Sequence, residues 1–343
     1  MKLAEIQTIN ELNPIEGADR IVLAKVQGWQ SVVQRDQFNV GDRVVFVPID
    51  TVLRPEAWNS FLQSKSNPTA PIRVKTARLR GVVSQGLIFP LTILPDPFFE
   101  HEIGTDVADL IGVTKYEKPI PAHLAGQVAG DFPTHLLSKT DEDNLKSITE
   151  VFEELKEADI VQATDKEDGT SATYIKELDG TFRVCSRNLE LKDTESNVHW
   201  QMARKYNLKE DLKAGYAIQG EIVGPGIQGN PAGYEEVDLI IFNLIDLTTR
   251  RPLVLERWGN IEMFGRNKRT TQFAGSWSGK ELQSMTIDDL QEFVNKRTYI
   301  NGKPSEGMVF RGYKREGEVL VPMYSKKLQK MLSVKIINQN YKD

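Results

Sequence analysis

Residues 160–178 read IVQATDKEDGTSATYIKEL, in which two strand-like segments, IVQAT and SATYIKEL, flank a short charged turn. Lys166 lies in this turn, two residues before Asp168 and three before Gly169. Gly169 has no side chain, so another stretch of backbone can approach it closely. The turn has two interpretations, a solvated connection at the end of a sheet or a loop that presents Lys166 as a nucleophile. Residues elsewhere in the chain distinguish between them.

Polar and aromatic side chains recur at the ends of the strand-like segments that follow. Arg187, in SRNLE, carries a guanidinium suited to bidentate binding of a phosphate or a sugar oxygen. Glu221 lies in the apolar segment YAIQGEIV, directly before a glycine-rich turn. Phe242 and Asp246 lie in LIIFNLID, where an aromatic residue taken alone is more typical of a core than of a base-stacking surface.

Two more charged residues lie in apolar segments near the end of the sequence. Glu306, the second residue of SEGMVF, lies at the start of an apolar segment, and Lys335 lies inside SVKIINQNY. An unpaired charge inside a protein is costly, so each of these residues needs a partner or a ligand. The ordered set from Lys166 to Lys335 is therefore consistent with a pocket for an adenylate and its phosphates.

The chemistry of such a pocket depends on the protonation of Lys166. A lysine amine attacks an α-phosphate only when it is deprotonated, and nearby cations such as Mg²⁺ and Lys335 would lower the pKa of Lys166. Asp168 and Glu306 would hold a Mg²⁺ or Mn²⁺ ion directly or through water. Lys335 would neutralise the charge that develops on the phosphate.

These segments resemble the motifs of the covalent nucleotidyltransferases, which include RNA ligases, DNA ligases and mRNA capping enzymes. KEDGTS is similar to their nucleotidyl-lysine motif K-x-D-G, and SRNL, QGE, FNLID, EGMVF and SVKIIN resemble the motifs that follow it over residues 150–343. The last motif is often K-x-K in related ligases, whereas here Ile337 occupies the position of the second lysine. Lys326 and Lys327 are alternative positions for that lysine.

The sequence before this region predicts a small β-barrel of the OB type. Strand-like segments lie at residues 20–29, 31–34, 42–49, 72–80 and 85–91, with turn-forming residues between them. In the segment IRVKTARLR, Arg73 and Lys75 share one strand face, and Arg78 and Arg80 share a face as well. These four residues are candidates for a groove that follows a nucleic-acid backbone.

An OB-like module that precedes a nucleotidyltransferase domain is similar to the arrangement in RNA ligase family 5. The resemblance implies an α+β fold, with an OB-like nucleic-acid-binding domain at residues 1–118 and an adenylation domain, related to ATP-grasp enzymes, at residues 119–343. It implies an ATP-dependent RNA ligase that acts through a lysyl-AMP intermediate on Lys166. It also implies that Lys166 and Lys335 are catalytic, that Asp168, Glu306 and Asp246 bind the metal, and that the nucleotide is bound by Asp165, Gly169, Arg187, Glu221, Phe242, Glu306 and Lys335.

Composition limits the possible partners. The net charge of −5 does not favour nucleic acid, but its distribution matters more, since residues 61–90 contain five basic residues and no acidic one. The single cysteine, Cys185, excludes a disulfide framework and a cysteine-based zinc site. Without a long apolar run or a signal-peptide core, we expect a cytoplasmic protein. We expect a monomer that acts on a nicked duplex with RNA on the 3′-hydroxyl side.

Two other functions fit parts of the sequence. PIEGADRIVLAKV resembles the tRNA-binding OB modules of the aminoacyl-tRNA synthetase system, which would suit a nucleic-acid-binding protein without catalysis. A capping-type guanylyl transfer is the other alternative, and the lack of an OB-like segment after the last motif makes it less favoured. The residues alone do not distinguish ATP from GTP.

Local sequence patterns predict three helices, and a concentration of prolines predicts one linker. The helices are expected at residues 141–159, 197–208 and 286–297, and a proline-rich linker or domain edge is expected at residues 94–135.

Overall fold

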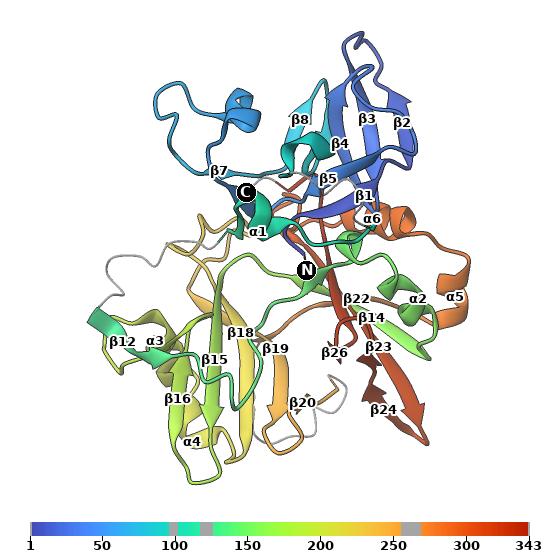
Figure 1. The fold of residues 1–343 in the computed structure, drawn as a ribbon. Coiled ribbons are helices and arrows are strands. Elements are labelled where there is room, and N and C mark those ends of the chain that lie inside the picture. Colours follow the sequence, from blue (N-terminus) through green and yellow to red (C-terminus); the bar gives the residue numbers. More distant parts are fainter. Residues whose placement is uncertain (1, 96–101, 117–125, 255–268, 342–343) are drawn as a thin grey trace. The chain divides into compact units, whose positions relative to one another are not determined.

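The computed structural model describes residues 2–95, 102–116, 126–254 and 269–341. Two compact units emerge from the contacts within the chain, the first formed by residues 1–119 and 145–149 and the second by residues 120–144 and 150–343. Figure 1 shows the elements of both units, which are described separately here.

The first unit consists of short antiparallel strands around one apolar core. Trp29, Phe46 and Leu53 are among its fully buried side chains. In the described residues β5 lies between β1 and β10, β3 between β2 and β4, and β6 between β7 and β11, while β8 pairs with β9. The strands are β1 (Glu5–Thr8), β2 (Glu11–Pro14), β3 (Ile21–Val26), β4 (Trp29–Gln34), β5 (Arg43–Val47), β6 (Thr51–Leu53), β7 (Ile72–Arg73), β8 (Ala77–Leu79), β9 (Val82–Ser84), β10 (Leu87–Pro90) and β11 (Val113–Lys115). The helical segments are η1 (Ala57–Leu62), η2 (Leu91–Ile93), α1 (Ala108–Ile111) and η5 (Leu145–Ser147).

The segment expected to form one strand at residues 72–80 forms two strands instead. β7 ends at Arg73, and β8 begins at Ala77 and leads into a tight hairpin. Arg80 lies in this hairpin turn with a φ of 51°, in the left-handed region. The expected strand faces therefore do not form, because the strand is interrupted at residues 74–76 and Arg80 lies in the hairpin turn.

The described part of the second unit contains two large sheets and a two-stranded sheet of β25 and β26. Among the described residues, the first sheet has the strand order β12-β17-β16-β15-β18-β19-β20 with β21 beside β19, and the second has the order β13-β27-β23-β14-β22 with β24 beside β23. The strands are β12 (Val128–Asp131), β13 (Asp143–Asn144), β14 (Ile160–Lys166), β15 (Thr170–Lys176), β16 (Phe182–Cys185), β17 (Leu189–Leu191), β18 (Tyr216–Val223), β19 (Asp238–Asp246), β20 (Arg251–Pro252), β21 (Arg269–Thr270), β22 (Phe273–Trp277), β23 (Gly307–Glu316), β24 (Val319–Pro322), β25 (Tyr324–Ser325), β26 (Lys330–Met331) and β27 (Ser333–Ile337). The helices are α2 (Val151–Lys156), α3 (Val198–Lys205), α4 (Leu208–Asp211), α5 (Gly279–Gln283) and α6 (Ile287–Asn295). Mainly antiparallel sheets with flanking helices confirm the α+β prediction.

The charged turn KEDG connects the two large sheets of this unit. Lys166 is the last residue of β14 in one sheet, and Thr170 is the first residue of β15 in the other. Most of the pairs in both sheets are antiparallel, as for β14 with β23 and β15 with β18. The turn is therefore not a hairpin within one sheet, and its residues lie where the two sheets approach each other.

The prediction of one long helix at residues 141–159 is wrong. Residues 143–144 form β13, which pairs in parallel with β27, and the helix α2 spans only Val151–Lys156. Leu145 and its neighbours up to residue 149 belong to the first unit, whereas Phe152 and Leu155 are buried in the second. The helical periodicity therefore combined apolar residues that belong to two different cores.

The other two predicted helices are confirmed as α3 and α6. In the predicted linker at residues 94–135, the described residues include α1, β11 and β12, while Pro97, Pro119 and Pro121 lie outside the described residues. Among the described residues, no helix combines the length and the apolar character needed to cross a membrane.

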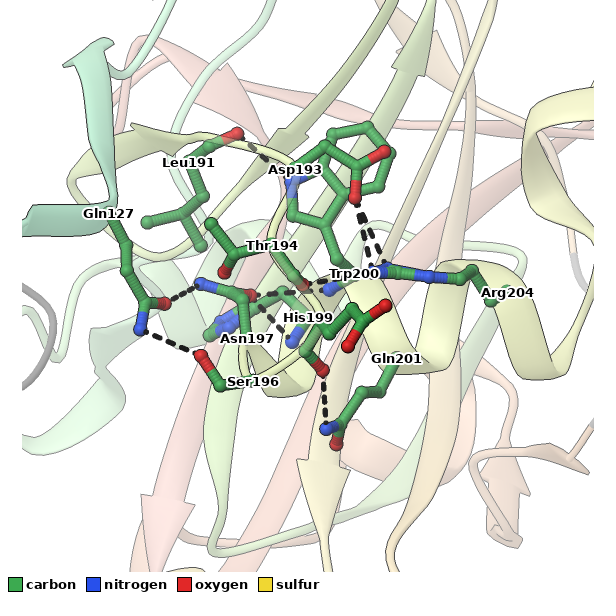
Figure 2. Close-up of polar contacts among 11 residues, drawn as sticks. Gln127, Leu191, Asp193, Thr194, Ser196, Asn197, His199, Trp200, Gln201 and Arg204 are labelled. Carbon is green, nitrogen blue, oxygen red and sulfur yellow. Dashed lines mark hydrogen bonds and ion pairs between the residues drawn. The ribbon is translucent and has the colours of Figure 1, made fainter.

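A polar network fixes the start of α3 (Figure 2). The Asn197 side chain accepts hydrogen bonds from the backbone N–H groups of His199 and Trp200, at 2.9 and 3.2 Å, and donates one to Gln127 at 2.7 Å. The buried His199 ring donates through Nε2 to the carbonyl of Ser171, 3.1 Å away. Because Ser171 follows the charged turn by two residues, this network supports the strand into which the turn leads.

The same contact predicts an acid-sensitive stability. A carbonyl can only accept, so His199 carries its proton on Nε2, and burial lowers the pKa of the ring to about 4. The unfolded chain binds this proton near the usual histidine pKa of about 6.5. The contribution of the neutral ring to the free energy of unfolding is therefore fully present above that pH. It is lost as the pH falls toward the pKa of the folded protein, by at most about 3 kcal/mol. We expect His199→Gln, which keeps the N–H donor, to flatten this decline in denaturant titrations between pH 7 and 4. The exposed His135→Gln variant should keep the decline, and an unchanged slope in His199→Gln would contradict the assignment.

Candidate active site

A cavity of about 380 Å³ lies in the second unit and is lined by residues from both of its large sheets. From the sheet of β14 it receives Lys166, and from the other sheet it receives Glu221 and Phe242. A segment before β13, which includes Ser138 and Asp141, also lines the cavity. Residues separated by more than one hundred positions in the sequence thus share one pocket.

Lys166, which lines the cavity, forms an ion pair with Glu306. Its Nζ atom lies 2.6 Å from Glu306 Oε1, because Lys166 pairs with Gly307 in the register of β14 and β23. Burial opposes the charge of the ammonium, but the carboxylates of Glu306 and Glu221 outweigh it and raise the pKa of Lys166. The sequence analysis expected cations to lower this pKa, whereas in this structure the carboxylates keep the lysine protonated.

Carboxylates outnumber their cationic partners around Lys166. Burial and the repulsion of Glu306 and Asp168 raise the pKa of Glu221 to about 8. Burial, with Asp165 and Glu306 nearby, raises the pKa of Glu167 to about 7. Among the described residues, the buried Oε2 atoms of Glu167 and Glu306 have no hydrogen-bond partner. Such a cluster attracts cations or the hydrogen-bond donors of a ligand.

The carboxylates are hard oxygen donors of the type that Mg²⁺ and Mn²⁺ prefer. In the described part of the chain, no three His, Cys, Asp or Glu side chains are already arranged to hold a metal ion. A site of one or two carboxylates completed by substrate phosphates and water does not need such a group of three. The unpartnered oxygen of Glu306 and the mutual repulsion of the carboxylates fit a divalent ion bound together with phosphates.

An irregularity in β19 shapes the other side of the cavity. Gln219 of β18 is opposite Asn243, but the next residue, Gly220, is opposite Ile241, so Phe242 is an extra residue that forms a β-bulge. The bulge shifts the alternation of the strand, so that the consecutive residues Phe242 and Asn243 both line the cavity while Ile241 and Leu244 are in the core. An aromatic ring and an amide group are thereby placed side by side.

Two basic residues of the cavity were not identified from the sequence. Arg311 of β23 is only 5% exposed, and its guanidinium donates to Ser333 at 3.3 Å and to the Phe242 carbonyl at 3.4 Å. The Lys330 ammonium donates to the Asp141 carbonyl and pairs with Asp143, each at 2.9 Å. Arg311 follows the apolar segment GMVF and Lys330 follows the polar turn at residues 326–329, so neither sequence context indicates a residue of the cavity.

Comparison with known proteins identifies the family. An RNA ligase family model matches residues 159–323, and an OB-fold domain model matches residues 3–91. A structure of Naegleria gruberi RNA ligase with PPi is 30% identical to this chain and has a TM-score of 0.81, over 98% of this chain and 97% of that chain. The chain belongs to the RNA ligase family.

Other structures of the same ligase agree with this assignment. A mutant with ATP and Mn has a TM-score of 0.81, and a mutant with AMP and Mn has a TM-score of 0.82; each is 30% identical and covers 98% of this chain and 97% of that chain. A comparison with curated protein sequences gave no significant match. The predicted N-terminal OB fold and the resemblance to family 5 are both confirmed.

Of the residues expected at the site of this RNA ligase, four line the cavity: Asp165, Lys166, Glu221 and Phe242. Glu306 does not line it but pairs with Lys166, and the other expected residues, Asp168, Gly169, Arg187, Asp246 and Lys335, are not among the lining residues either. The guanidinium of Arg187 lies 2.6 Å from Asp141, at the cavity edge, and both side chains are 44% exposed. Asp246 accepts hydrogen bonds from the backbone N–H groups of Thr248 and Thr249, at 2.7 and 3.2 Å. Its carboxylate therefore stabilises the turn after β19, and it is not among the residues that line the cavity.

The last motif lies on β27, which pairs with β23, the strand that begins directly after Glu306. Lys335 of β27 is opposite Val309 of β23, which lines the cavity, and the Lys335 charge opposes the rise in the pKa of Glu306 that burial causes. Ile337, at the position of the missing second lysine, pairs with Gly307. Lys326 and Lys327 are exposed and do not line the cavity. Lys330 is the basic residue of this region that reaches the cavity.

The C-terminal segment also contacts the charged turn. The Tyr341 hydroxyl donates to Asp168 Oδ2 at 2.5 Å, and the backbone N–H of Asn338 donates to the Glu306 carbonyl at 2.9 Å. Asp168 is therefore held by a tyrosine that lies six residues beyond Lys335, a contact that the sequence does not reveal.

Of the four basic residues expected to line a groove of the OB unit, one is engaged in contacts within the unit and three are exposed. The Arg73 guanidinium lies 3.7 Å above the Tyr116 ring and 3.4 Å from Asp50, so it is engaged within the unit. Lys75, Arg78 and Arg80 are exposed. These three residues remain candidates for contact with nucleic acid.

Arg297 fixes the residue that precedes Lys166. Its guanidinium donates to both carboxylate oxygens of Asp165, at 3.0 and 2.8 Å, and the Asp165 side chain is 12% exposed. Asp165, predicted to bind the nucleotide, lines the cavity, but its carboxylate is engaged by Arg297 in this structure.

Removing Arg297 should destabilise the second unit measurably. We expect Arg297→Met to lower the free energy of unfolding by about 2 kcal/mol, because the largely buried Asp165 carboxylate loses its partner. Urea titration of the full chain measures this change. Arg204→Met, which breaks a more exposed pair with Asp193, should cost less than about 1 kcal/mol. Equal decreases in the free energy of unfolding in the two variants would show that the Arg297–Asp165 pair stabilises the protein no more than an exposed ion pair does.

Proposed function

We propose that this RNA ligase joins a 3′-hydroxyl to a 5′-phosphate in a three-step, ATP-dependent reaction in which Lys166 carries AMP. The observation that carries the proposal is the position of Lys166, whose amine lies in the cavity beside Glu306, with Glu221 and Phe242 on the opposite sheet. The related Naegleria gruberi ligase has been solved with PPi, with ATP and Mn, and with AMP and Mn, which supports adenylyl transfer as the chemistry.

In the first step Lys166 attacks the α-phosphorus of ATP. The ammonium first loses a proton, for which Glu306 Oε1 at 2.6 Å is the nearest acceptor. A P–N bond then forms, the bond from the α-phosphorus to the bridging oxygen breaks, and pyrophosphate leaves with the electron pair. The phosphates of bound ATP bring negative charge toward Glu306 and Glu221, so positive charge is needed here for the lysine to become neutral.

In the second step a 5′-phosphate oxygen attacks the phosphorus of the lysyl adenylate. The P–N bond breaks, Lys166 regains a proton, and an adenylylated 5′ end forms. In the third step the 3′-oxygen attacks the 5′-phosphorus, releases AMP and loses its proton, which leaves a phosphodiester. Arg187 and Lys330, at or near the edge of the cavity, are placed to bind phosphate oxygens in exchange for Asp141.

Asp168 and Glu306 are the residues proposed to hold a divalent cation together with phosphate oxygens. Such an ion supplies positive charge that favours the neutral amine and the developing charge on phosphorus. Lys335, whose charge acts on Glu306, stabilises the same phosphate. Phe242 is proposed to stack on the base, and Glu221 to accept a hydrogen bond from the nucleotide.

The substrate proposed for the whole chain is a nicked duplex with RNA on the 3′-hydroxyl side. Residues 1–118 are assigned to nucleic-acid binding, with Lys75, Arg78 and Arg80 exposed for this purpose, and residues 119–343 to adenylyl transfer. The chain is proposed to act as a monomer.

Covalent labelling tests the proposal. The protein is incubated with α-labelled ATP and Mg²⁺ or Mn²⁺, and label on the denatured protein is measured. We expect acid-labile label that added pyrophosphate removes as ATP, and that a nicked duplex with a 3′-terminal ribonucleotide converts to free AMP and sealed product. Absence of covalent label under all of these conditions would refute the lysyl-AMP mechanism. Label without sealing would refute the proposed substrate only.

A further inference from the structure

A chain of two amide side chains crosses the base-binding side of the cavity. The Gln219 amide donates through Nε2 to the backbone carbonyl of Ser138 at 3.0 Å. The Asn243 amide donates through Nδ2 to Gln219 Oε1 at 2.9 Å. Gln219 is only 2% exposed, whereas Asn243 is half-buried, and all three residues line the cavity.

The Ser138 carbonyl fixes the direction of every hydrogen bond in this chain. A carbonyl oxygen only accepts, so the Gln219 atom beside it must be the NH₂ group, and the oxygen of Gln219 must face Asn243. Asn243 must in turn place its NH₂ group against that oxygen. The remaining polar atom of the side chain, Oδ1, accepts no hydrogen bond among the described residues. One N–H of the Asn243 NH₂ group is therefore used by Gln219, and Oδ1 remains as an acceptor. The Oδ1 atom and the NH₂ group cannot exchange positions without breaking the chain.

The β-bulge places this acceptor beside the proposed stacking surface. Phe242 and Asn243 are consecutive residues that both line the cavity, and their Cα atoms are about 3.8 Å apart. The edge of a base stacked on the Phe242 ring is thus within reach of the Asn243 side chain.

We propose that Asn243, held by Gln219 and the Ser138 carbonyl, selects ATP over GTP by accepting a hydrogen bond from the 6-amino group of adenine. Guanine has an oxygen at this position, and two acceptors that face each other in a half-buried site repel and leave both unsatisfied. The inference rests on the proposed adenylyl transfer and names the group that reads the base. Asn243 is a specificity-determining residue in this view, and Gln219 positions it.

Nucleotide analogues separate this role from a structural one. Rates of covalent labelling are compared for α-labelled ATP, purine riboside triphosphate, which lacks the 6-amino group, and ITP, which has an oxygen there. For the unaltered protein we expect ATP to react about tenfold faster than purine riboside triphosphate, with ITP slowest. In Asn243→Leu, which is similar in size, the ratio between ATP and purine riboside triphosphate should fall to about one. Gln219→Met should raise the rate for ITP relative to ATP about tenfold, because the Asn243 amide becomes free to turn its NH₂ group toward the base.

Ratios of labelling rates between nucleotides distinguish a change in base recognition from a loss of folded protein. A folding defect lowers all rates together and leaves the ratios unchanged, and Gln283→Leu, at an exposed position on α5, should leave the ratios as they are. Covalent labelling with unchanged ratios in Asn243→Leu would overturn the assignment of Asn243 while leaving the proposed function intact. A selective loss of ITP labelling in that variant would also overturn it, because Asn243 would then face the N1–H group. Absence of label from every nucleotide in the unaltered protein would overturn both the function and this inference.

Discussion

Replacement of Lys166 by alanine is expected to abolish covalent labelling by α-labelled ATP, with a loss of at least about a thousandfold. The Nζ atom is the only nitrogen of the lysine side chain, and alanine has no atom that can form the P–N bond to AMP. Lys166→Arg should be equally inactive, since a guanidinium remains protonated at any pH at which the protein is folded. Label on the denatured protein, measured after single-turnover incubation, quantifies the loss.

A lysine elsewhere in the same unit provides the control. Lys213 is exposed and lies outside the cavity, so Lys213→Ala should label at the rate of the unaltered protein. Thermal unfolding of both variants shows whether the second unit remains folded. Label that persists in Lys166→Ala would place AMP on a different residue, and the nucleophile assignment would then be wrong.

Replacement of Gly169 by alanine should reduce labelling about a hundredfold or more. A Cβ atom at this position would lie 2.2 Å from the Ile222 carbonyl oxygen and 2.8 Å from Glu221 Cγ. The closest of these atoms belongs to the backbone of β18, so the conflict is relieved only if the loop moves away from the strand. Since Lys166 lies three residues earlier, a displacement of about 1 Å at the nucleophile is enough for a loss of this size.

Gly130 is a suitable comparison for Gly169. A Cβ atom at Gly130, in β12, would have no atom within 4 Å, and we expect Gly130→Ala to label normally. Rates of labelling and midpoints of thermal unfolding should be measured for both variants. Normal labelling by Gly169→Ala would show that the approach of the loop to β18 is not required for adenylylation.

The sequence predicted those features that depend on residues close together in the chain. The strand, charged turn and strand around Lys166, and the helices α3 and α6, follow from local patterns of apolar and polar residues. Glu221 and Glu306 attract attention in the sequence because Glu221 lies in an apolar strand and Glu306 directly precedes one, where a carboxylate needs a reason to be present. The family resemblance then supplied their order and their common pocket.

Other features depend on contacts between distant residues and leave no local signal. The bulge at Phe242 lies in an apolar run, where a change in the alternation of inward and outward residues is not visible. Arg297 and Tyr341 reach Asp165 and Asp168 from more than one hundred residues away. The helix expected at residues 141–159 failed for a related reason, because its apolar residues contribute to two separate cores.

The turn KEDG joins one sheet to the other, and this divides the site into two functional walls. Lys166, Glu306 and Lys335 belong to the sheet of β14, β23 and β27, or border it, whereas Gln219, Phe242 and Asn243 belong to β18 and β19. In the mechanism and the base recognition that we propose, one wall holds the reacting groups and the other reads the base. We therefore expect choice of nucleotide and rate of bond formation to be separable properties, so that the base preference of the enzyme can be redesigned on β18 and β19 without altering the residues that form the P–N bond.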